Sequence, residues 1–317
     1  MTDDAPTEGS LLSPRKIALQ TVGFVVGVAL LIWCIKTAFG GDGDEWRRIA
    51  HANPWLVLGL VGCTLVSMFV NGTLFWLVAQ PMQRLGFRDM QWLNLVTAVL
   101  NYAPIRAGLI ARVAYHLRVD RLSLLEIGAY LAAIAYTLAL TVGSCIVATL
   151  IRPGIDGWWW ALLLGQLALG GGLTWALMGQ PLVARYGRGM DEMLRQPLCL
   201  WGAIGLRLVD IGAFVGRMFC AVAILELDLS GPETVLLGIA AITLSLNPIG
   251  RTGFREIAVA FVASQLVSPD LSNTELDSAM ATLALVESAG EAMVAIPLGA
   301  ICLLWYRRRW KNAKPSP

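Results

Sequence analysis

The sequence has little charge and few of the residues that build catalytic or metal sites. Only 15% of its 317 residues are Asp, Glu, Lys or Arg, and the net charge of +2 gives no overall field for nucleic acid. The six cysteines lie in apolar runs without metal-site spacing, so we expect no metal and no cofactor. The two histidines, His51 and His116, fall near the expected membrane interface, and no catalytic triad can be built with them. We therefore expect neither an enzyme nor a nucleic-acid partner.

Apolar sequence, in contrast, is abundant. Hydrophobic residues make up 56% of the chain, which is well above the share in soluble domains. A helix that crosses the hydrocarbon core of about 30 Å needs about 20 apolar residues. The sequence therefore predicts an all-α membrane protein, a polytopic helical bundle whose six full spans are 17–39, 54–79, 123–150, 158–178, 198–225 and 279–305.

Two further apolar regions, 90–117 and 233–267, are interrupted in the middle by Pro, Gly and Arg. The first break reads NYAPIRAG and the second reads NPIGRTG. Backbone freed at such breaks cannot face lipid, so each break must be buried in protein or line a wet cavity. Each region is either a kinked crossing or a hairpin that re-enters its own side of the membrane.

The loop charges decide between these readings, because Lys and Arg collect in cytoplasmic loops. If both regions are hairpins, 14 loop Lys and Arg lie inside and 3 outside, whereas two crossings would divide them 10 to 7. We therefore predict two re-entrant hairpins and cytoplasmic N- and C-termini. The 14 inner residues are Arg15, Lys16, Arg84, Arg88, Arg118, Arg121, Arg185, Arg188, Arg195, Arg307, Arg308, Arg309, Lys311 and Lys314, and the outer three are Arg47, Arg48 and Arg152.

The order of elements repeats along the chain. Two spans, a hairpin and a span form a first repeat, 17–150, and again a second repeat, 151–305, between a cytoplasmic tail, 1–16, and a basic cytoplasmic tail, 306–317. Three crossings per unit is an odd number, so the second unit is inverted relative to the first. Paired interrupted segments in inverted halves point to a transporter site at the midplane, although two kinked bundle helices are the alternative. The predicted tip residues are Asn101, Pro104 and Gly108 in one half and Asn247, Pro248, Gly250 and Gly253 in the other.

Seven Lys and Arg lie outside the loops, and a charge at membrane depth usually faces a cavity or a partner. Arg106 and Arg251 are at the hairpin tips, where guanidinium groups and half-helix N-termini suit a phosphate or carboxylate. Pairing with acids is the structural alternative for both. Arg112 and Arg255 are expected in the first turn or so of the following half-helices and would widen the site. Lys36 lies near a helix end and can snorkel.

The fifth full span carries Arg207, Asp210 and Arg217 on one helix face, which fits either an ion pair or a ligand site. Several acids are also expected in or beside the membrane. We favour a role for these acids as counter-ions to Arg106, Arg251 or Arg255, with carriage of a proton as the alternative. The acids are Glu126, Glu256, Glu287 and Glu291.

Short motifs at the two breaks resemble a known family. They are P-x-R-x-G-x3-R, from Pro104 to Arg112, and P-x-G-x2-G-x2-E, from Pro248 to Glu256, and they resemble the lysylphosphatidylglycerol synthase transmembrane region, or flippase-like domain. The resemblance covers about 15 to 305 and implies paired re-entrant helices. The chain departs from the family pattern at Leu109, where an acid is usual, at Arg251, where a small residue is usual, and in the last span, which has two Glu where an Arg is usual.

The resemblance implies a flippase or lipid transporter of the cytoplasmic (inner) membrane. Its cargo would be an anionic or phosphate-bearing lipid: a phospholipid, an aminoacyl-phospholipid or a polyprenyl-phosphate-linked head group. The aminoacyl transferase of the synthases is not among the 317 residues, so we expect a protein that moves a lipid and does not make one. Membrane lipids are the expected partners, and a homo-oligomer is compatible with the sequence. The alternatives are a transporter or channel for a small soluble anion and, last, an intramembrane transferase, for which no nucleophile–base pair is present.

Overall fold

A computed structural model describes most of the chain. The described residues are 44–102, 107–152, 154–180, 189–244 and 273–313, with Val259 and five helical residues from Val25 to Lys36. These residues are all-α and contain no strand. Five helices are long and apolar enough to cross a membrane, which indicates a multi-pass membrane protein. They are α3 (Pro54–Ala79), α6 (Leu124–Ile151), α7 (Gly157–Leu177), α10 (Pro197–Ile224) and α13 (Asn273–Asn312).

Five of the six predicted spans correspond to these helices. α3 has the predicted bounds, and each end of α6, α7 and α10 differs by one residue. α13 extends beyond the predicted 279–305 at both ends and holds Pro297 in its interior. The remaining predicted span, 17–39, lies outside the described residues except for the five helical positions.

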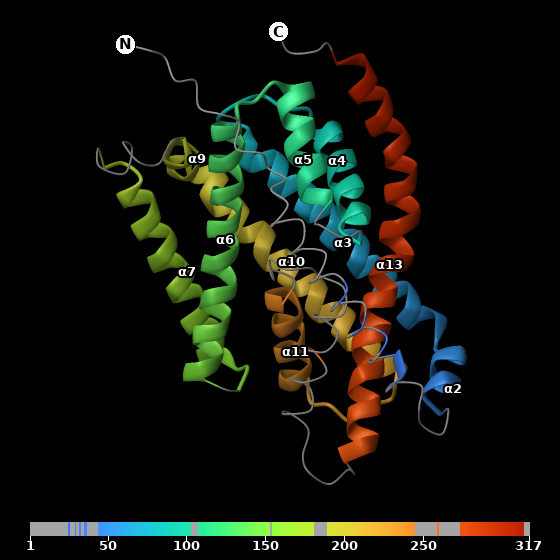
Figure 1. The fold of residues 1–317 in the computed structure, drawn as a ribbon. Coiled ribbons are helices and arrows are strands. Elements are labelled where there is room, and N and C mark those ends of the chain that lie inside the picture. Colours follow the sequence, from blue (N-terminus) through green and yellow to red (C-terminus); the bar gives the residue numbers. More distant parts are fainter. Residues whose placement is uncertain are drawn as a thin grey trace, which may run out of the picture.

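The helices form a bundle around a central pair, α3 and α10 (Figure 1). α6 and α7 lie side by side on one flank, α13 and α4 (Phe87–Leu100) on the other, and α11 (Gly231–Leu244) packs against α10. Small residues allow close packing, which matters in lipid because apolar surface alone does not drive helices together there. Gly216 of α10, for example, faces Cys63 of α3, and Gly290 of α13 faces Leu60 of α3.

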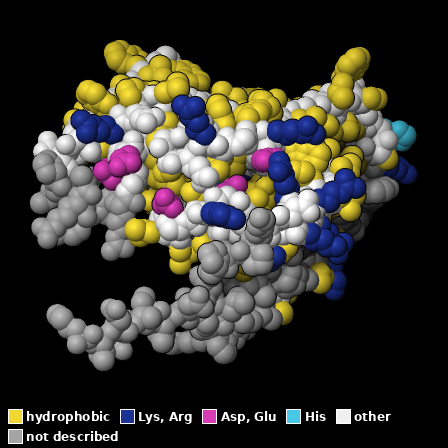
Figure 2. Space-filling model, turned by 90° about the horizontal axis from the view of Figure 1, so that it is seen from above, with side chains coloured by type: hydrophobic (Ala, Val, Ile, Leu, Met, Phe, Trp, Pro, Cys, Tyr) yellow, Lys and Arg dark blue, Asp and Glu magenta, His cyan; other side chains and the backbone are white. Residues whose placement is uncertain are grey.

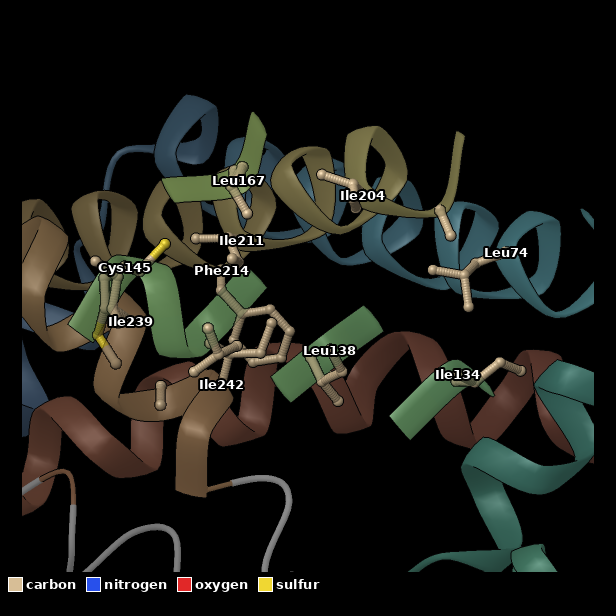
Figure 3. Close-up of a cluster of buried hydrophobic side chains, with 14 of the residues drawn as sticks. Leu74, Ile134, Leu138, Cys145, Leu167, Ile204, Ile211, Phe214, Ile239 and Ile242 are labelled. Carbon is tan, nitrogen blue, oxygen red and sulfur yellow. The ribbon is translucent and has the colours of Figure 1, made fainter. Parts of the chain in front are cut away.

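Apolar side chains fill the bundle and also cover its outside. Leu138 of α6, Phe214 of α10 and Ile242 of α11 belong to one buried cluster (Figure 3). On the outer surface, large apolar side chains such as Leu150 and Leu198 are about three-quarters exposed. Apolar exposure on this scale is expected where helices face lipid.

The first broken region folds back on itself as a helical hairpin of α4 and α5 (Ala107–Tyr115). Contacts with α13 fix the direction of α4. Asp89, near the start of α4, pairs with Arg309 at 2.9 Å, whereas Val99, near its end, faces Gly299. α4 therefore runs along α13 from its C-terminal end toward its middle.

α5 returns toward the C-terminal end of α13. The carbonyl of Ala111 accepts a hydrogen bond of 3.0 Å from the Tyr306 hydroxyl, and Tyr115 stacks on Trp305. A short π-helix, η2 (His116–Asp120), follows α5 where the sequence predicted only the end of an apolar half-helix. The chain thus enters and leaves the hairpin at the same end of the bundle.

Gly108 permits the close approach of the two hairpin arms. A Cβ at this position would overlap the carbonyl oxygen of Thr97 and Oδ1 of Asn101, both in the last turn or cap of α4. Asn101 and Gly108 therefore meet at the turn, as two of the predicted tip residues. The third, Pro104, lies outside the described residues.

Basic side chains gather at the end of the bundle where the hairpin begins and ends. Figure 2 shows several Lys and Arg side chains on this face. The loop from α3 to α4, η2, a short helix α9 (Met190–Arg195) and the last turns of α13 all lie at this end (Figure 1). At the opposite end, where α6 joins α7, Arg152 pairs with Asp156 at 2.6 Å, and this hydrogen bond lowers the pKa of the Asp156 carboxyl.

Parts of the second half lie outside the described residues. α11 corresponds to the first arm of the second broken region, and Val259 is helical, but residues 245–258 and 260–272 are not described. Two short helices, α9 and α2 (Asp44–Ala50), occupy segments that the sequence predicted as loops.

Substitution of Gly108 by Ala is expected to destabilise the hairpin. The added methyl group would meet a backbone carbonyl, which cannot rotate away, so α4 and α5 must separate; overpacking of this kind typically costs about 1–3 kcal/mol. We expect a lower thermal unfolding midpoint for the purified protein in detergent. Gly128→Ala in α6 is the matched control, because a Cβ there meets nothing within 4 Å, and a midpoint for Gly108→Ala at or above that control would contradict the close packing.

Candidate functional site

Three buried arginines lie in the described part of the bundle, on α5 and α10. They are Arg112, Arg207 and Arg217, and each is at most 4% exposed. Many of the other residues predicted from the sequence to form the site lie outside the described residues. These are Arg106, Arg251, Arg255, Glu256, Pro104, Asn247, Pro248, Gly250 and Gly253.

Arg112 is held by neutral groups from α3 and α4. Its Nη2 donates to Oδ1 of Asn94 at 3.0 Å and to Oγ1 of Thr97 at 2.9 Å. The guanidinium carbon lies 3.5 Å from the ring centroid of Phe75. Arg112 stands in the last turn of α5, whereas the sequence predicted the first turn or so, because the helix begins at Ala107 and is only nine residues long.

Arg112 has no carboxylate within 4.0 Å among the described residues. Its Nη1 also has no hydrogen-bond partner there, although the Tyr130 hydroxyl of α6 lies close enough to interact with the guanidinium electrostatically. A buried charge of this kind is costly unless it is paired. Arg112 therefore has capacity for an anion that the described residues do not use.

Arg207 forms a self-contained polar cluster with α3. Its Nη1 donates to Asn71 Oδ1 at 2.9 Å and lies 3.3 Å from Oδ2 of Asp210. The other carboxylate oxygen of Asp210 accepts from Ser67 at 2.6 Å and from Asn71 at 3.0 Å. Of the two roles predicted for Arg207 and Asp210, the ion pair is the one that this geometry supports.

Arg217 is clamped between two carboxylates of α13. Its Nη2 lies 2.8 Å from Glu287 and its Nη1 lies 3.1 Å from Glu291. The guanidinium also lies over the ring of Phe214 at 4.0 Å. Glu287 and Glu291 are thus counter-ions of Arg217, because α10 and α13 meet in the bundle. The arginines to which the sequence assigned them, Arg106, Arg251 and Arg255, lie outside the described residues.

Glu126 has a local role that the sequence assignment missed. It caps α6: Ser123 N and Oγ donate to Glu126 Oε2, and Ser123 Oγ accepts from Glu126 N. Its side chain is exposed, so it does not balance a buried arginine. The S-x-x-E spacing of a capping box was the signal for this.

A hydrogen-bonded His–Asp pair beside Arg112 was also missed from the sequence. His116 is fully buried in η2, and its Nδ1 lies 2.7 Å from Oδ2 of Asp120. Burial lowers the pKa of His116, Asp120 opposes that shift, and Arg112 adds to it. The four-residue spacing of His and Asp was the available signal, but the π-helix that turns His116 inward has no sequence signature.

Comparisons of the chain with family models, with curated proteins and with solved structures give no match. The resemblance to the flippase-like domain therefore stays a prediction from the two short motifs. The proposed function therefore rests on the geometry of the buried arginines.

Removal of the Arg217 guanidinium is expected to destabilise the protein strongly. In Arg217→Gln, Glu287 and Glu291 would lose the cation between them, and breaking a buried pair typically costs about 3–5 kcal/mol. Arg152→Gln is the control, because its exposed pair with Asp156 is worth at most about 1 kcal/mol. Thermal unfolding in detergent measures both variants. Similar midpoints for the two variants would show that the Arg217 cluster does not hold α10 to α13.

Proposed function

We propose that the protein is a lipid transporter of the flippase type that moves a phosphate-bearing head group across the cytoplasmic membrane past Arg112. One observation carries the proposal. Arg207 and Arg217 each have a carboxylate within 4.0 Å, whereas Arg112 has none among the described residues. A buried guanidinium held only by neutral groups is a natural partner for an anion, and its planar fork can bind two phosphate oxygens at once.

The depth of the hairpin supports a site inside the membrane. Gly299, beside the end of α4, and Arg309, beside its start, are ten residues apart on α13. A helix rises 1.5 Å per residue, so this distance is about 15 Å, or half of a hydrocarbon core of about 30 Å. With the basic end of α13 at the membrane surface, the hairpin is re-entrant and ends near the midplane.

The charge distribution supports the orientation. The basic loops and the last turns of α13 lie at one end of the bundle, and Lys and Arg collect in cytoplasmic loops. In this orientation the α4–α5 hairpin enters from the cytoplasm, and Arg112 lies between its tip and the cytoplasmic surface. A head group leaving the inner leaflet would meet Arg112 before the tip.

The remaining parts of the proposal come from the sequence. Arg106 and Arg251 are expected to take over the phosphate at the two tips, with the second hairpin entering from the opposite side as the inverted half. Arg255 and Glu256 are expected beside the second tip. The choice of a lipid over a soluble anion rests on the motif resemblance, since both ligands offer the same charge to Arg112.

Substitution of Arg112 by Gln is expected to reduce lipid transport at least about tenfold. The amide cannot replace the charge or the fork of hydrogen bonds, and a hydrogen bond to a charged group is worth about 1.5–3 kcal/mol. Transport is measured in proteoliposomes as dithionite bleaching of NBD-labelled phosphatidic acid and phosphatidylglycerol, with and without a pH gradient. Arg152→Gln, at the opposite end of the bundle, should retain wild-type rates.

Two outcomes would overturn the proposal. Wild-type lipid transport by a folded Arg112→Gln variant would remove Arg112 from the pathway. Uptake of inorganic phosphate that depends on Arg112, in the absence of lipid movement, would identify a transporter of a soluble anion instead.

A further inference from the structure

We propose that Arg112, His116 and Tyr130 form one subsite that prefers a phosphate monoester to a phosphodiester. The inference rests on the proposed function and deepens it, because it names the class of head group that Arg112 accepts. It follows from three polar atoms on buried, neighbouring side chains: Nη1 of Arg112, Nε2 of His116 and Oη of Tyr130. None of the three has a hydrogen-bond partner within 3.5 Å in the described part of the protein, although the Tyr130 hydroxyl is near enough to the Arg112 guanidinium for a longer and weaker hydrogen bond.

The three side chains come from consecutive elements, α5, η2 and α6, and form one cluster. The rings of His116 and Tyr130 meet edge to face with centroids 5.6 Å apart. The Tyr130 hydroxyl interacts electrostatically with the Arg112 guanidinium. Phe75 of α3 joins them, since its ring contacts both the Arg112 guanidinium and the Tyr130 ring.

Three buried polar atoms that lack a close hydrogen-bond partner are unusual on neighbouring side chains. Arg112, His116 and Tyr130 are at most 3% exposed, and buried polar atoms in proteins nearly always have a hydrogen-bond partner. The local backbone is unusual too, because η2 is a π-helix and Arg121, the residue that caps its C-terminus, has a φ of 56°. π-Helices are rare and are frequent at functional sites. The π-helical turn carries both His116 and its partner Asp120.

The Asp120 carboxylate fixes the proton on His116. It accepts a hydrogen bond from Nδ1, so Nδ1 carries the proton of the neutral imidazole. Burial lowers the pKa of His116, which favours the neutral imidazole. Nε2 is therefore an acceptor that faces away from Asp120. The titratable and charged groups around the ring are Asp120 from η2, Arg112 and Tyr115 from α5, and Tyr130 from α6.

The cluster therefore combines donors with an acceptor. Nη1 of Arg112 donates, the Tyr130 hydroxyl donates or accepts, and Nε2 of His116 accepts. A phosphate monoester loses its second proton near pH 6, so near that pH about half of it is singly protonated and offers one O–H beside several acceptor oxygens. That form pairs with all three atoms. A phosphodiester has no O–H at neutral pH and would leave Nε2 of His116 buried and unpaired.

The subsite lies at the cytoplasmic half of the proposed path. Tyr115, next to His116, stacks on Trp305, only a few residues before the basic run of α13. Arg118 of η2 lies over the ring of Trp310 in that run, at 4.6 Å. A lipid phosphate could thus reach the subsite from the inner leaflet while its tails remain in the bilayer.

The test measures binding of three probes to the purified full-length protein in phosphate-free detergent buffer near pH 6, where the singly protonated monoester is abundant, by titration calorimetry. The probes are dihexanoyl phosphatidic acid, dihexanoyl phosphatidylglycerol and inorganic phosphate. We expect the wild type to bind the phosphatidic acid at least about tenfold more tightly than the phosphatidylglycerol, because an unpaired buried acceptor is costly. Equal or tighter binding of the phosphatidylglycerol would overturn the inference.

Two conservative variants test which side chains produce the preference for a phosphate monoester. His116→Asn retains a donor for Asp120 but lacks the Nε2 position, and Tyr130→Phe loses only the hydroxyl. We expect His116→Asn to weaken binding of the phosphatidic acid at least about fivefold while binding of the phosphatidylglycerol stays within twofold of wild type. Tyr130→Phe should weaken binding of both lipids, because the hydroxyl can donate to either phosphate. Equal weakening of both lipids in His116→Asn, or unchanged binding of both in Tyr130→Phe, would overturn the assignment. Thermal unfolding checks that each variant is folded.

The binding and transport measurements together distinguish a failure of the inference from a failure of the proposed function. Binding of inorganic phosphate as tight as that of the phosphatidic acid, without lipid transport in proteoliposomes, would support the monoester subsite and overturn the lipid cargo. Arg112-dependent transport of both lipids without a monoester preference would support the transporter and overturn the subsite.

Discussion

The close contact of α4 and α5 at Gly108 determines where the guanidinium of Arg112 lies. It brings the two arms of the hairpin together, so Arg112 of α5 reaches across to Asn94 and Thr97 of α4. The hairpin is in turn attached to α13 at both of its ends, through the Asp89–Arg309 pair and the Tyr306 hydroxyl. Without this contact the guanidinium of Arg112 would lose its hydrogen bonds to α4.

The three buried arginines illustrate two uses of charge in a membrane protein. Arg207 and Arg217 are neutralised by carboxylates of the bundle, and each joins α10 to a neighbouring helix, so they hold the structure together. Arg112 is satisfied only in part, by neutral oxygens and an aromatic ring. Incomplete pairing is expensive for stability, and a transport site must keep such capacity for its cargo.

The large-scale architecture followed from simple physical limits. The bounds of α3, α6, α7 and α10 were predictable because the hydrocarbon thickness sets the length of an apolar run. The fold-back at Asn101 and Gly108 was predictable as a break, since Pro and Gly end a helix. The Gly and Pro residues do not reveal which helices then pack together.

The partners of the charges were much less predictable. The pairing of Glu287 and Glu291 with Arg217 depends on the packing of α10 on α13, which spacing within one helix does not reveal. The role of Glu126 in helix capping was readable from S-x-x-E and was overlooked. The inward turn of His116 depends on a π-helix that no local pattern indicates.

Analysis of the lipids that co-purify with the protein tests the central claim most directly. Mass spectrometry would compare the wild type with Arg112→Gln and, as a control, with Arg152→Gln. If Arg112 is the anion site of a lipid transporter, a phosphate-bearing lipid is enriched in the wild type and in the control and is lost from Arg112→Gln. An identical lipid profile in all three proteins would contradict the account.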